Sequence, residues 1–386
     1  MPKALFITVD GQFRTWPGIW TDVFRRNGFE PCHVSLGKHW EFAVNYGAPH
    51  PSEDYDVEDL AGFAKWRAPD QSGNRFLPAN TSDEDILSTV AVVETVITGN
   101  HPDLVCVWGN TTMQSRAASE ICRRRGIPVF YMETGFFPSP DSWKTMFICD
   151  HVGMYFQGRS HLQSVADSLC AGNSITEIGP ELLDYIDKWK STKSSKYEQE
   201  YGAILWPRDK TLFVPLQTPR DATMYYPRTI VNNPRALIQW ILDHLPDGWY
   251  PIFKKHPGDP TSMSEYIPNT HRDYTILERG NIHDLILNSD AVATINSTVG
   301  IETLMLGKRL ITLGDAFYSD MGWTEDIHKI EDLPRALNRI ENDPVVSGKC
   351  LRRLYQFLHW IIFKYLTDPD KVDNLMEKYI TARQSV

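Results

Sequence analysis

Short apolar runs alternate with helical patterns along the first half of the chain. The apolar runs have the length and the β-branched content of buried strands, and the stretches between them repeat apolar residues with a helical period. The predicted strands cover residues 4–9, 31–36, 104–108 and 128–132, and the predicted helices cover 17–27, 84–98 and 113–125. Such alternation predicts parallel strands joined by right-handed crossovers, and therefore an α/β domain.

A second alternation follows a polar segment that lacks a core-forming pattern. Its predicted strands cover residues 211–216, 250–254, 274–277, 291–295 and 309–313, and its predicted helices cover 234–244, 282–288 and 299–306. Helical patterns also cover residues 333–341, 348–365 and 371–383 near the C-terminus. These patterns indicate a second doubly wound sheet followed by C-terminal helices.

The two alternations suggest domain boundaries. A chain of 386 residues suits two domains of ordinary size. We expect Rossmann-like domains at residues 1–189 and 211–345, a linker at 190–210, and C-terminal helices at 346–386. This is the α/β architecture called GT-B, in which two such domains face each other across a cleft and ligands bind at the carboxyl ends of the strands. Residues 37–82 show little periodicity, and loops of that length are usually functional or carry small structure of their own.

Composition and charge narrow the classes of function. A hydrophobic content of 42% and a charged content of 23% describe a globular chain. The net charge of −10 argues against a general nucleic-acid binder, which needs a surplus of Lys and Arg. The N-terminal apolar run is too short for a signal peptide, and no run approaches the roughly 20 residues that span a bilayer. We therefore expect a cytoplasmic protein, with peripheral association at the inner membrane left open.

Polar residues follow a buried strand at the start of a predicted helix in the second domain. The strand leads into Asn296, Ser297 and Thr298. Hydroxyls and free backbone N–H groups at a helix start suit a phosphate, although one hydroxyl could instead simply cap the helix. One turn further on, Glu302 could hold ribose hydroxyls or could be an exposed helix charge.

A histidine marks another strand end of the same domain. His256 is followed by Pro257 and preceded by Lys254 and Lys255. The imidazole could donate to a phosphate or to a sugar carboxylate, with a lysine supplying charge. Most His-Pro pairs are structural, but this one lies 40 residues before Asn296 within one predicted domain, which favours the functional interpretation.

Two carboxylates end strands in different domains. Asp221 follows Gln217 and Arg220 after the first strand of the second domain, where it could act as nucleophile or base, or could cap a turn. Glu133 ends a predicted strand of the first domain beside Gly135, which would allow close approach of a substrate. Glu133 is therefore a candidate acid or base facing Asp221, and its alternative is a surface loop acid.

Four segments together resemble the bacterial retaining β-Kdo glycosyltransferases of capsule polysaccharide and lipopolysaccharide O-antigen synthesis. They are Glu-Thr-Gly-Phe-Phe-Pro (133–138), Gln-Thr-Pro-Arg-Asp (217–221), Lys-Lys-His-Pro (254–257) and Thr-Ile-Asn-Ser-Thr-Val-Gly-Ile-Glu (294–302). Residues 306–318 are similar to the family stretch that follows the Asn-Ser-Thr helix. The resemblance is clear from about residue 130 to 324.

The resemblance implies a reaction and a division of roles. The donor would be CMP-β-Kdo, bound by domain 211–345, and the acceptor a glycan or glycolipid on the side of domain 1–189. Asp221 would be the nucleophile that displaces CMP, and Glu133 would assist the acceptor hydroxyl. The other expected donor-binding residues are Gln217, Arg220, Lys255, His256, Asn296, Ser297, Thr298 and Glu302. No cofactor or metal is expected, because no metal-spaced Cys/His cluster occurs in the sequence.

Other functions remain open from the sequence. CDP-glycerol glycerophosphotransferases and bacterial sialyltransferases share a His-Pro and a serine-containing turn from strand to helix. The Gln-x-x-x-Asp strand end favours the Kdo transferases, because a phosphoryl-transfer site needs no nucleophile under an anomeric carbon. A non-catalytic component of polysaccharide assembly is the alternative from another class. Partners at the membrane or in polysaccharide assembly fit either case, and nucleic acid fits neither.

Overall fold

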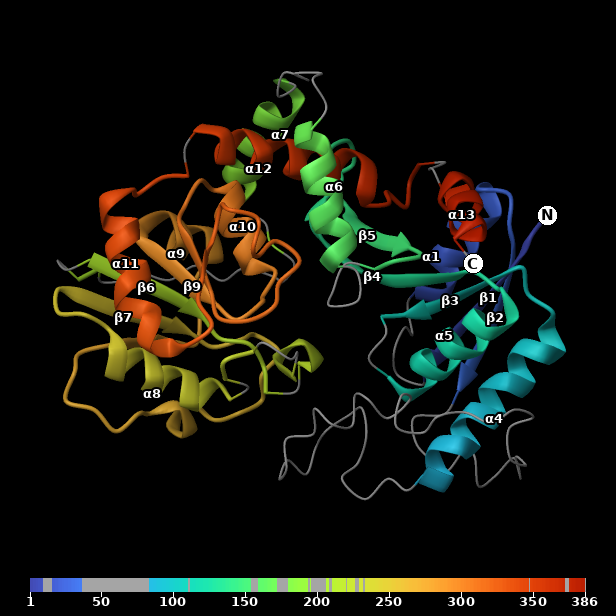
Figure 1. Ribbon diagram of the computed structural model, residues 1–386, viewed down its shortest axis with the longest axis horizontal. Helices are drawn as coiled ribbons and strands as arrows, with labels where there is room; N and C mark the ends of the chain where they lie inside the picture. The colour runs from blue at the N-terminus through green and yellow to red at the C-terminus, as the bar shows by residue number, and fades with distance from the viewer. Residues whose placement is uncertain are drawn as a thin grey trace. The chain divides into compact units, whose positions relative to one another are not determined.

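The computed structural model contains two compact units (Figure 1). The first combines Met1–Gly153 with Tyr365–Val386, and the second is Met154–Lys364. The structure describes residues 1–9, 16–36, 83–109, 112–153, 159–171, 180–193, 195, 206–207, 210–219, 221–225, 229–231, 233–346, 348–371 and 375–385. The predicted loop 37–82 and most of the predicted linker lie outside these residues.

The sheet of the first unit has five strands in the order β2-β1-β3-β4-β5. They are β1 (Lys3–Val9), β2 (Glu30–Leu36), β3 (Leu104–Trp108), β4 (Val129–Pro138) and β5 (Thr145–Asp150). β1 to β4 are parallel, as the sequence predicts, but β5 pairs antiparallel with β4. The sequence analysis did not predict β5, which a short hairpin connection returns along the β4 edge.

Helices cover both faces of this sheet. They are α1 (Trp16–Arg26), α4 (Asp83–Asn100), α5 (Met113–Arg125) and α13 (Leu375–Gln384). α4 and α5 share a buried apolar cluster with one face, and α1 and α13 share a second cluster with the other. Leu375, Tyr379 and Ala382 recur at helical spacing and are buried, so a single stripe of α13 joins the chain end to this core.

The sheet of the second unit has six parallel strands in the order β11-β10-β9-β6-β7-β8. They are β6 (Lys210–Pro215), β7 (Trp249–Lys254), β8 (Thr275–Leu277), β9 (Ala291–Thr294), β10 (Leu310–Thr312) and β11 (Glu325–Asp326). The chain builds β7 and β8 on one side of β6 and then returns to place β9 on the other. The gap between β6 and β9 is therefore the topological switch point, where open α/β sheets bind ligands.

The helices of the second unit are α6 (Arg159–Ala171), α7 (Pro180–Thr192), α8 (Pro234–His244), α9 (Ile282–Asn288), α10 (Val299–Met305), α11 (Leu333–Asn342) and α12 (Gly348–Trp360). Short 3₁₀ segments cover Ala222–Tyr225, Met263–Tyr266 and Ile330–Asp332, and a π-helical turn, Ile361–Tyr365, extends α12. α8 and α11 bury their apolar stripes against one face of the sheet. α8 begins where Asn233 caps it and Pro234 takes its first position.

The compact units differ from the boundaries expected from the sequence. α6 and α7 pack against α12 and so belong with the second unit, although residues 1–189 were expected to form the first domain. The ion pair between Arg353 and Asp167, at 2.6 Å, is one of these contacts. The C-terminal helices do not form a separate segment either, because α12 belongs to the second unit and α13 to the first.

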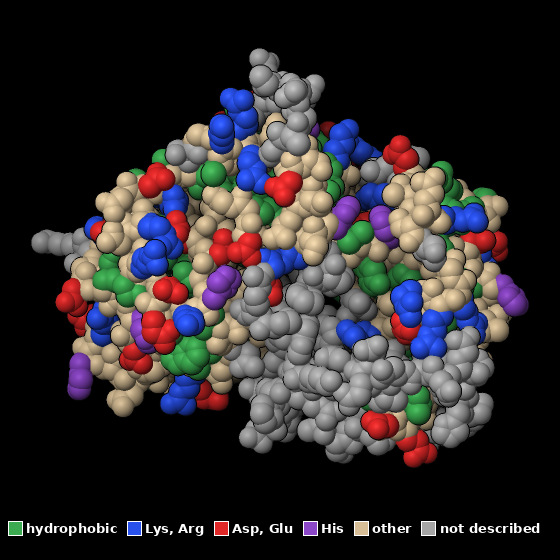
Figure 2. Space-filling view, in the orientation of Figure 1, with side chains coloured by type: hydrophobic (Ala, Val, Ile, Leu, Met, Phe, Trp, Pro, Cys, Tyr) green, Lys and Arg blue, Asp and Glu red, His purple; other side chains and the backbone are tan. Residues whose placement is uncertain are grey.

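The predicted fold class is confirmed: two α/β units with parallel strands, and C-terminal helices. The cleft between them stays a prediction. Acidic and basic side chains are interspersed across the described residues on the face shown in Figure 2. Among the described helices, none is long and apolar enough to cross a membrane.

Candidate functional site

A reciprocal pair of hydrogen bonds spans the switch point of the second sheet. The side-chain amide of Gln217, just past β6, donates from Nε2 to Oδ1 of Asn296, just past β9, at 2.9 Å. The backbone N–H of Asn296 donates back to Oε1 of Gln217 at 3.2 Å. Both residues are buried, so these bonds fix the two loops relative to each other.

Asp221 and Thr223 extend this network. Oδ1 of Asp221 accepts from the backbone N–H of Thr223 at 2.9 Å and from its hydroxyl at 2.8 Å. Asp221 therefore caps the 3₁₀ turn at 222–225, as its structural alternative proposed. Its second oxygen, Oδ2, lies 3.4 Å from Nε2 of Gln217. The cap thus uses Oδ1 of Asp221 and leaves Oδ2 oriented toward Gln217.

Sequence analysis missed Thr223, which links both sides of the switch point. Its hydroxyl lies 3.1 Å from Nε2 of Gln217, and its carbonyl accepts from Nδ2 of Asn296 at 2.8 Å. The signal was available: an Asp followed two residues later by Thr is typical of a side-chain capped turn. The structure joins Gln217, Asp221, Thr223 and Asn296 into one hydrogen-bonded cluster.

His256 lies in a tight turn after β7, the strand beside β6. Its Nδ1 accepts the backbone N–H of Gly258 at 3.0 Å, and its carbonyl accepts that of Asp259 at 3.0 Å. Because Nδ1 is an acceptor, the neutral ring carries its proton on Nε2. The turn therefore presents Nε2–H as a donor, and the ring is only half-buried.

Two buried charges support this turn. Lys255 is 7% exposed, and Asp259 is 6% exposed. Burial acts to raise the pKa of Asp259, but hydrogen bonds from Tyr266 and Thr261 and the charge of Lys255 outweigh it, so that this pKa lies below its usual value. Asp259 thus bonds to His256 through its backbone N–H and to Thr261 and Tyr266 through its carboxylate, a role the sequence analysis did not assign.

Ser297 and Thr298 form the turn between β9 and α10. Ser297 accepts the backbone N–H of Val299 on its Oγ at 3.3 Å, so its hydroxyl makes a local contact at the helix start. Thr298 is the N-cap residue, but its side chain makes no capping bond. The hydroxyl of Tyr318 donates to the carbonyl of Ser297 at 2.5 Å and fixes the turn from outside.

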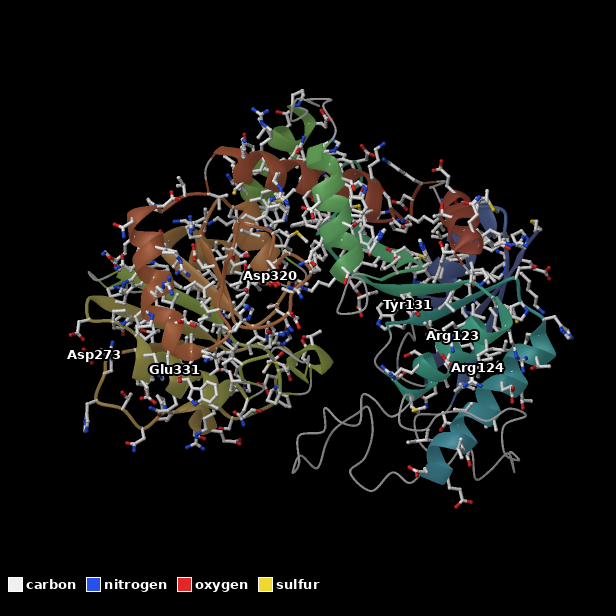
Figure 3. The ribbon with its side chains drawn as sticks, viewed as in Figure 1. Arg123, Arg124, Tyr131, Asp273, Asp320 and Glu331 are labelled. Carbon is white, nitrogen blue, oxygen red and sulfur yellow. The ribbon has the colours of Figure 1, made fainter. Side chains whose placement is uncertain are left out.

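The loop that carries Tyr318 is held by an arginine that sequence analysis missed. Arg159 of α6 pairs with Asp315 at 2.9 Å and with Asp320, which Figure 3 labels. Its Nε also donates to the carbonyl of Ala316 at 3.2 Å. Arg159 therefore orders the loop after β10, which in turn orders the turn at Ser297.

Glu302 is buried on α10 and is 1% exposed, so the alternative of an exposed helix charge is wrong. Its Oε1 accepts from the hydroxyl of Ser195 at 2.9 Å, and its Oε2 lies 3.9 Å from Nε2 of His283. The ring of Trp189 packs on His283 at 4.1 Å between centroids. The proposed contact of Glu302 with ribose hydroxyls stays a prediction.

Glu133 lies inside β4 rather than at its end. β4 continues to Pro138, and Glu133 pairs with Ile148 of β5. The parallel pairing of β4 with β3 stops at Met132, so Glu133 is the first residue beyond it. Its Oε1 accepts the backbone N–H of Thr134 at 2.8 Å.

The expectation for Gly135 is corrected. A Cβ at this position would lie 2.6 Å from the carbonyl oxygen of Met146 on β5. The glycine therefore admits the backbone of the neighbouring strand, and not a substrate. Sequence analysis could not find this partner, because it had not predicted β5.

The structure brings only some of the predicted site residues together. Gln217, Asp221 and Asn296 are joined at the switch point, and the turn of His256 follows the next strand. Glu133 belongs to the first unit, and its position opposite Asp221 stays a prediction. Arg220 lies outside the described residues.

The fold and this cluster define a two-unit α/β protein with a candidate ligand site at the switch point of its second sheet. Residues 183–357 match the family described as "Capsule polysaccharide biosynthesis protein". This match agrees with the capsule-associated part of the resemblance stated from the sequence.

The chain is also similar to individual curated proteins. The capsule polysaccharide modification protein LipA of Neisseria meningitidis serogroup A is 23% identical over 262 residues, which cover 63% of this chain and 35% of that protein. Protein FixF of Sinorhizobium fredii is 38% identical over 112 residues, covering 28% of this chain and 27% of FixF. The chain thus spans about a third of the length of these curated relatives.

A solved structure shares the fold. The β-Kdo 2,7 transferase part of Thermosulfurimonas dismutans KpsC has a TM-score of 0.51 and 16% identity, covering 99% of both chains. At this identity the similarity establishes the architecture, and the site must be argued from the residues of this chain.

Proposed function

We propose that this chain is a retaining glycosyltransferase that moves β-Kdo from CMP-β-Kdo to a glycan or glycolipid acceptor in capsule or lipopolysaccharide synthesis. Two comparisons support this assignment: the match of residues 183–357 to the capsule polysaccharide family, and the shared fold of the KpsC β-Kdo 2,7 transferase. The observation that carries it is the network of Gln217, Asp221 and Asn296, which aims a carboxylate oxygen at the switch point. In this proposal Oδ2 of Asp221 is the reacting oxygen, while Oδ1 caps the turn at 222–225.

The proposed reaction proceeds in two displacements. Oδ2 of Asp221 attacks the anomeric carbon, the bond from that carbon to the phosphate oxygen breaks, and CMP leaves. The acceptor hydroxyl then attacks the same carbon, its proton passes to the carboxylate of Glu133, and the bond to Asp221 breaks. Two inversions leave the β configuration unchanged.

The donor-binding residues have distinct roles in this proposal. Nε2–H of His256 and the hydroxyls of Ser297 and Thr298 donate to the phosphate and sugar carboxylate, and Lys255 adds positive charge. Glu302 and Arg220 remain in the predicted donor site. The proposed chemistry uses no metal.

Replacing the nucleophile tests the proposal. We expect Asp221→Asn to lower transfer from CMP-Kdo by at least about a thousandfold, as loss of a covalent nucleophile does in other enzymes. The readout is CMP release together with mass analysis of the intact protein for a Kdo adduct. Asp273→Asn is the matched control, since Asp273 is an exposed acid of the same unit (Figure 3). Unchanged transfer by Asp221→Asn would contradict the mechanism.

A donor screen separates the alternatives. CMP-Kdo, CMP-sialic acid and CDP-glycerol are compared with glycan and glycolipid acceptors, and only CMP-Kdo is expected to support turnover. Turnover with CDP-glycerol alone would replace the proposal by phosphoryl transfer. Binding without turnover of any donor would favour an assembly component. Cell fractionation tests the associated proposal of a cytoplasmic protein at the inner membrane.

A further inference from the structure

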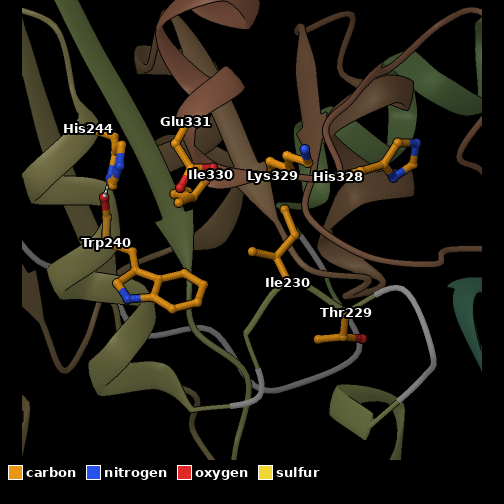
Figure 4. Close-up of a pocket in the computed structure, with 8 residues that line it drawn as sticks. All are labelled: Thr229, Ile230, Trp240, His244, His328, Lys329, Ile330 and Glu331. Carbon is orange, nitrogen blue, oxygen red and sulfur yellow. Dashed lines mark hydrogen bonds between the residues drawn. The ribbon is translucent and has the colours of Figure 1, made fainter.

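A pocket of about 680 Å³ opens in the second unit, apart from the cluster at the switch point. It is lined by residues 229–230, by Trp240 and His244 of α8, and by residues 328–331 after β11. Figure 4 shows these side chains arranged around one space. Its volume falls within the range of about 300–1,000 Å³ that is usual for small-molecule sites.

One part of the lining is apolar. Trp240 is half-buried and packs against the main core of the unit, as does Ile230. The backbone N–H of Ile230 bonds to the carbonyl of Leu313 at 2.9 Å, which fixes this segment beside the end of β10. A rigid indole face of this kind offers apolar contact to the C–H face of a sugar ring.

The lining also carries polar side chains. His328, Lys329 and Glu331 are exposed, and no hydrogen bond or ion pair ties their side chains to other described residues. His244 contacts the carbonyl of Trp240 through Nδ1 at 2.9 Å. A carbonyl only accepts, so the neutral ring of His244 is protonated at Nδ1 and leaves Nε2 as an acceptor.

We infer that this pocket of the second unit binds a carboxylated sugar unit of the acceptor glycan, separately from the donor and in addition to the acceptor contacts expected on the side of domain 1–189. Lys329, with His328 beside it, would pair with the carboxylate, and Glu331 and Nε2 of His244 would accept hydrogen bonds from ring hydroxyls. Trp240 would support the ring. The choice of an acidic sugar rests on the proposed function, in which such a sugar is already handled by the enzyme.

Binding experiments on the full chain test this assignment. The probes are the methyl β-glycoside of Kdo and its carboxyl-reduced analogue, titrated by ligand-observed NMR with saturating CMP present to occupy the nucleotide site. We expect the reduced analogue to bind about tenfold more weakly, as loss of a charge-assisted hydrogen bond implies. The substitution Lys329→Met should weaken binding of the carboxylated probe by a similar factor.

Control variants decide between outcomes. Lys349→Met removes an exposed lysine of the same unit outside the pocket and should leave binding unchanged. Equal binding of the two probes, or equal effects of Lys329→Met and Lys349→Met, would overturn the assignment. So would displacement of the sugar by raising CMP. If no donor supported turnover but binding of the carboxylated probe still depended on Lys329, the proposed function would fail. The assignment of this pocket as a carboxylated-sugar site would then be retained.

Discussion

Two side chains at the carboxyl ends of the strands, Asp221 and His256, each make a local hydrogen bond through only one of their two polar atoms. Oδ1 of Asp221 accepts a hydrogen bond from Thr223, while Oδ2 lies near the side-chain amide of Gln217. Nδ1 of His256 accepts a hydrogen bond from Gly258, so the neutral ring carries its proton on Nε2. Each residue is thus both a local cap and a candidate reactive group. The local bonds are observed, and the reactive roles of Asp221 and His256 stay predictions.

Thr223 tests the positioning of the proposed nucleophile. Thr223→Val keeps the side-chain shape but removes the hydroxyl that donates to Asp221 and contacts Gln217. We expect kcat for transfer to fall about tenfold, the equivalent of one hydrogen bond, with little change in the affinity for CMP. Thr223→Ser restores the hydroxyl and should recover most of the rate. An equal loss in both variants would contradict a positioning role.

Gly300 tests the contact that fixes the turn at Ser297. A Cβ at this position would lie 2.1 Å from the hydroxyl oxygen of Tyr318, which is itself bound to the carbonyl of Ser297. Gly300→Ala should therefore destabilise the protein by about 1–3 kcal/mol, the usual cost of overpacking. Thermal unfolding measures the loss. Gly99→Ala, where an added Cβ meets nothing within 4 Å, is the control and should not reduce stability.

Helices in both units begin and end where side chains satisfy free backbone groups. α5 begins at a capping box of Thr112 and Ser115 and ends at Gly126, whose φ of 65° is left-handed. Its last turn is basic, and Glu120 lies one turn earlier. Charges and caps of this kind are local in sequence, which is why the predicted bounds of this helix match the structure.

Glu120 gives α5 a dependence on pH. Hydrogen bonds from Arg123 and Arg124, both labelled in Figure 3, lower the pKa of Glu120 to about 2, although burial opposes the shift. A lowered carboxyl pKa stabilises the fold fully above about pH 4.5 and loses its effect as the pH falls toward 2. Glu120→Gln should therefore destabilise the protein by about 0.5–1 kcal/mol at pH 7, and by less at pH 3.

Chemical denaturation at several pH values measures this difference. Glu84→Gln, on the exposed start of α4, serves as the control. A loss of stability in Glu120→Gln that stays constant from pH 7 to 3 would show that packing, and not charge, links the three side chains.

The division of the molecule into two units does not follow the order of the chain, because the first unit combines the N-terminal and C-terminal segments. The first unit takes its last helix, α13, from the C-terminus, after the chain has completed the second unit. Leu375 and Tyr379 lie in the same cluster as Phe24 and Phe29 of the N-terminal region, with the rings of Phe29 and Tyr379 5.4 Å apart. The first unit therefore depends on residues more than 300 positions away.

Leu375 tests this dependence. Its side chain is fully buried, so Leu375→Ala should destabilise the first unit by about 2–4 kcal/mol. Ile380, on the same helix but 52% exposed, is the matched control, and Ile380→Ala should change stability by no more than about 0.5 kcal/mol. Hydrogen exchange should show loss of protection in β1 and α1 for Leu375→Ala, with the second unit unaffected. Equal loss in both units would contradict the division.

The sequence by itself determined most strands and helices, because a strand or helix of an α/β domain is encoded by the period of its own apolar residues. It also placed Gln217, His256 and Asn296 after the strands of the second sheet. Only the tertiary structure decided that β5 joins the first sheet, that Gly135 faces Met146, that Glu302 is buried, and that α13 belongs to the first unit. These features depend on which segments, distant in the sequence, pack against each other. The pattern of apolar residues within one segment does not specify which other segment it contacts.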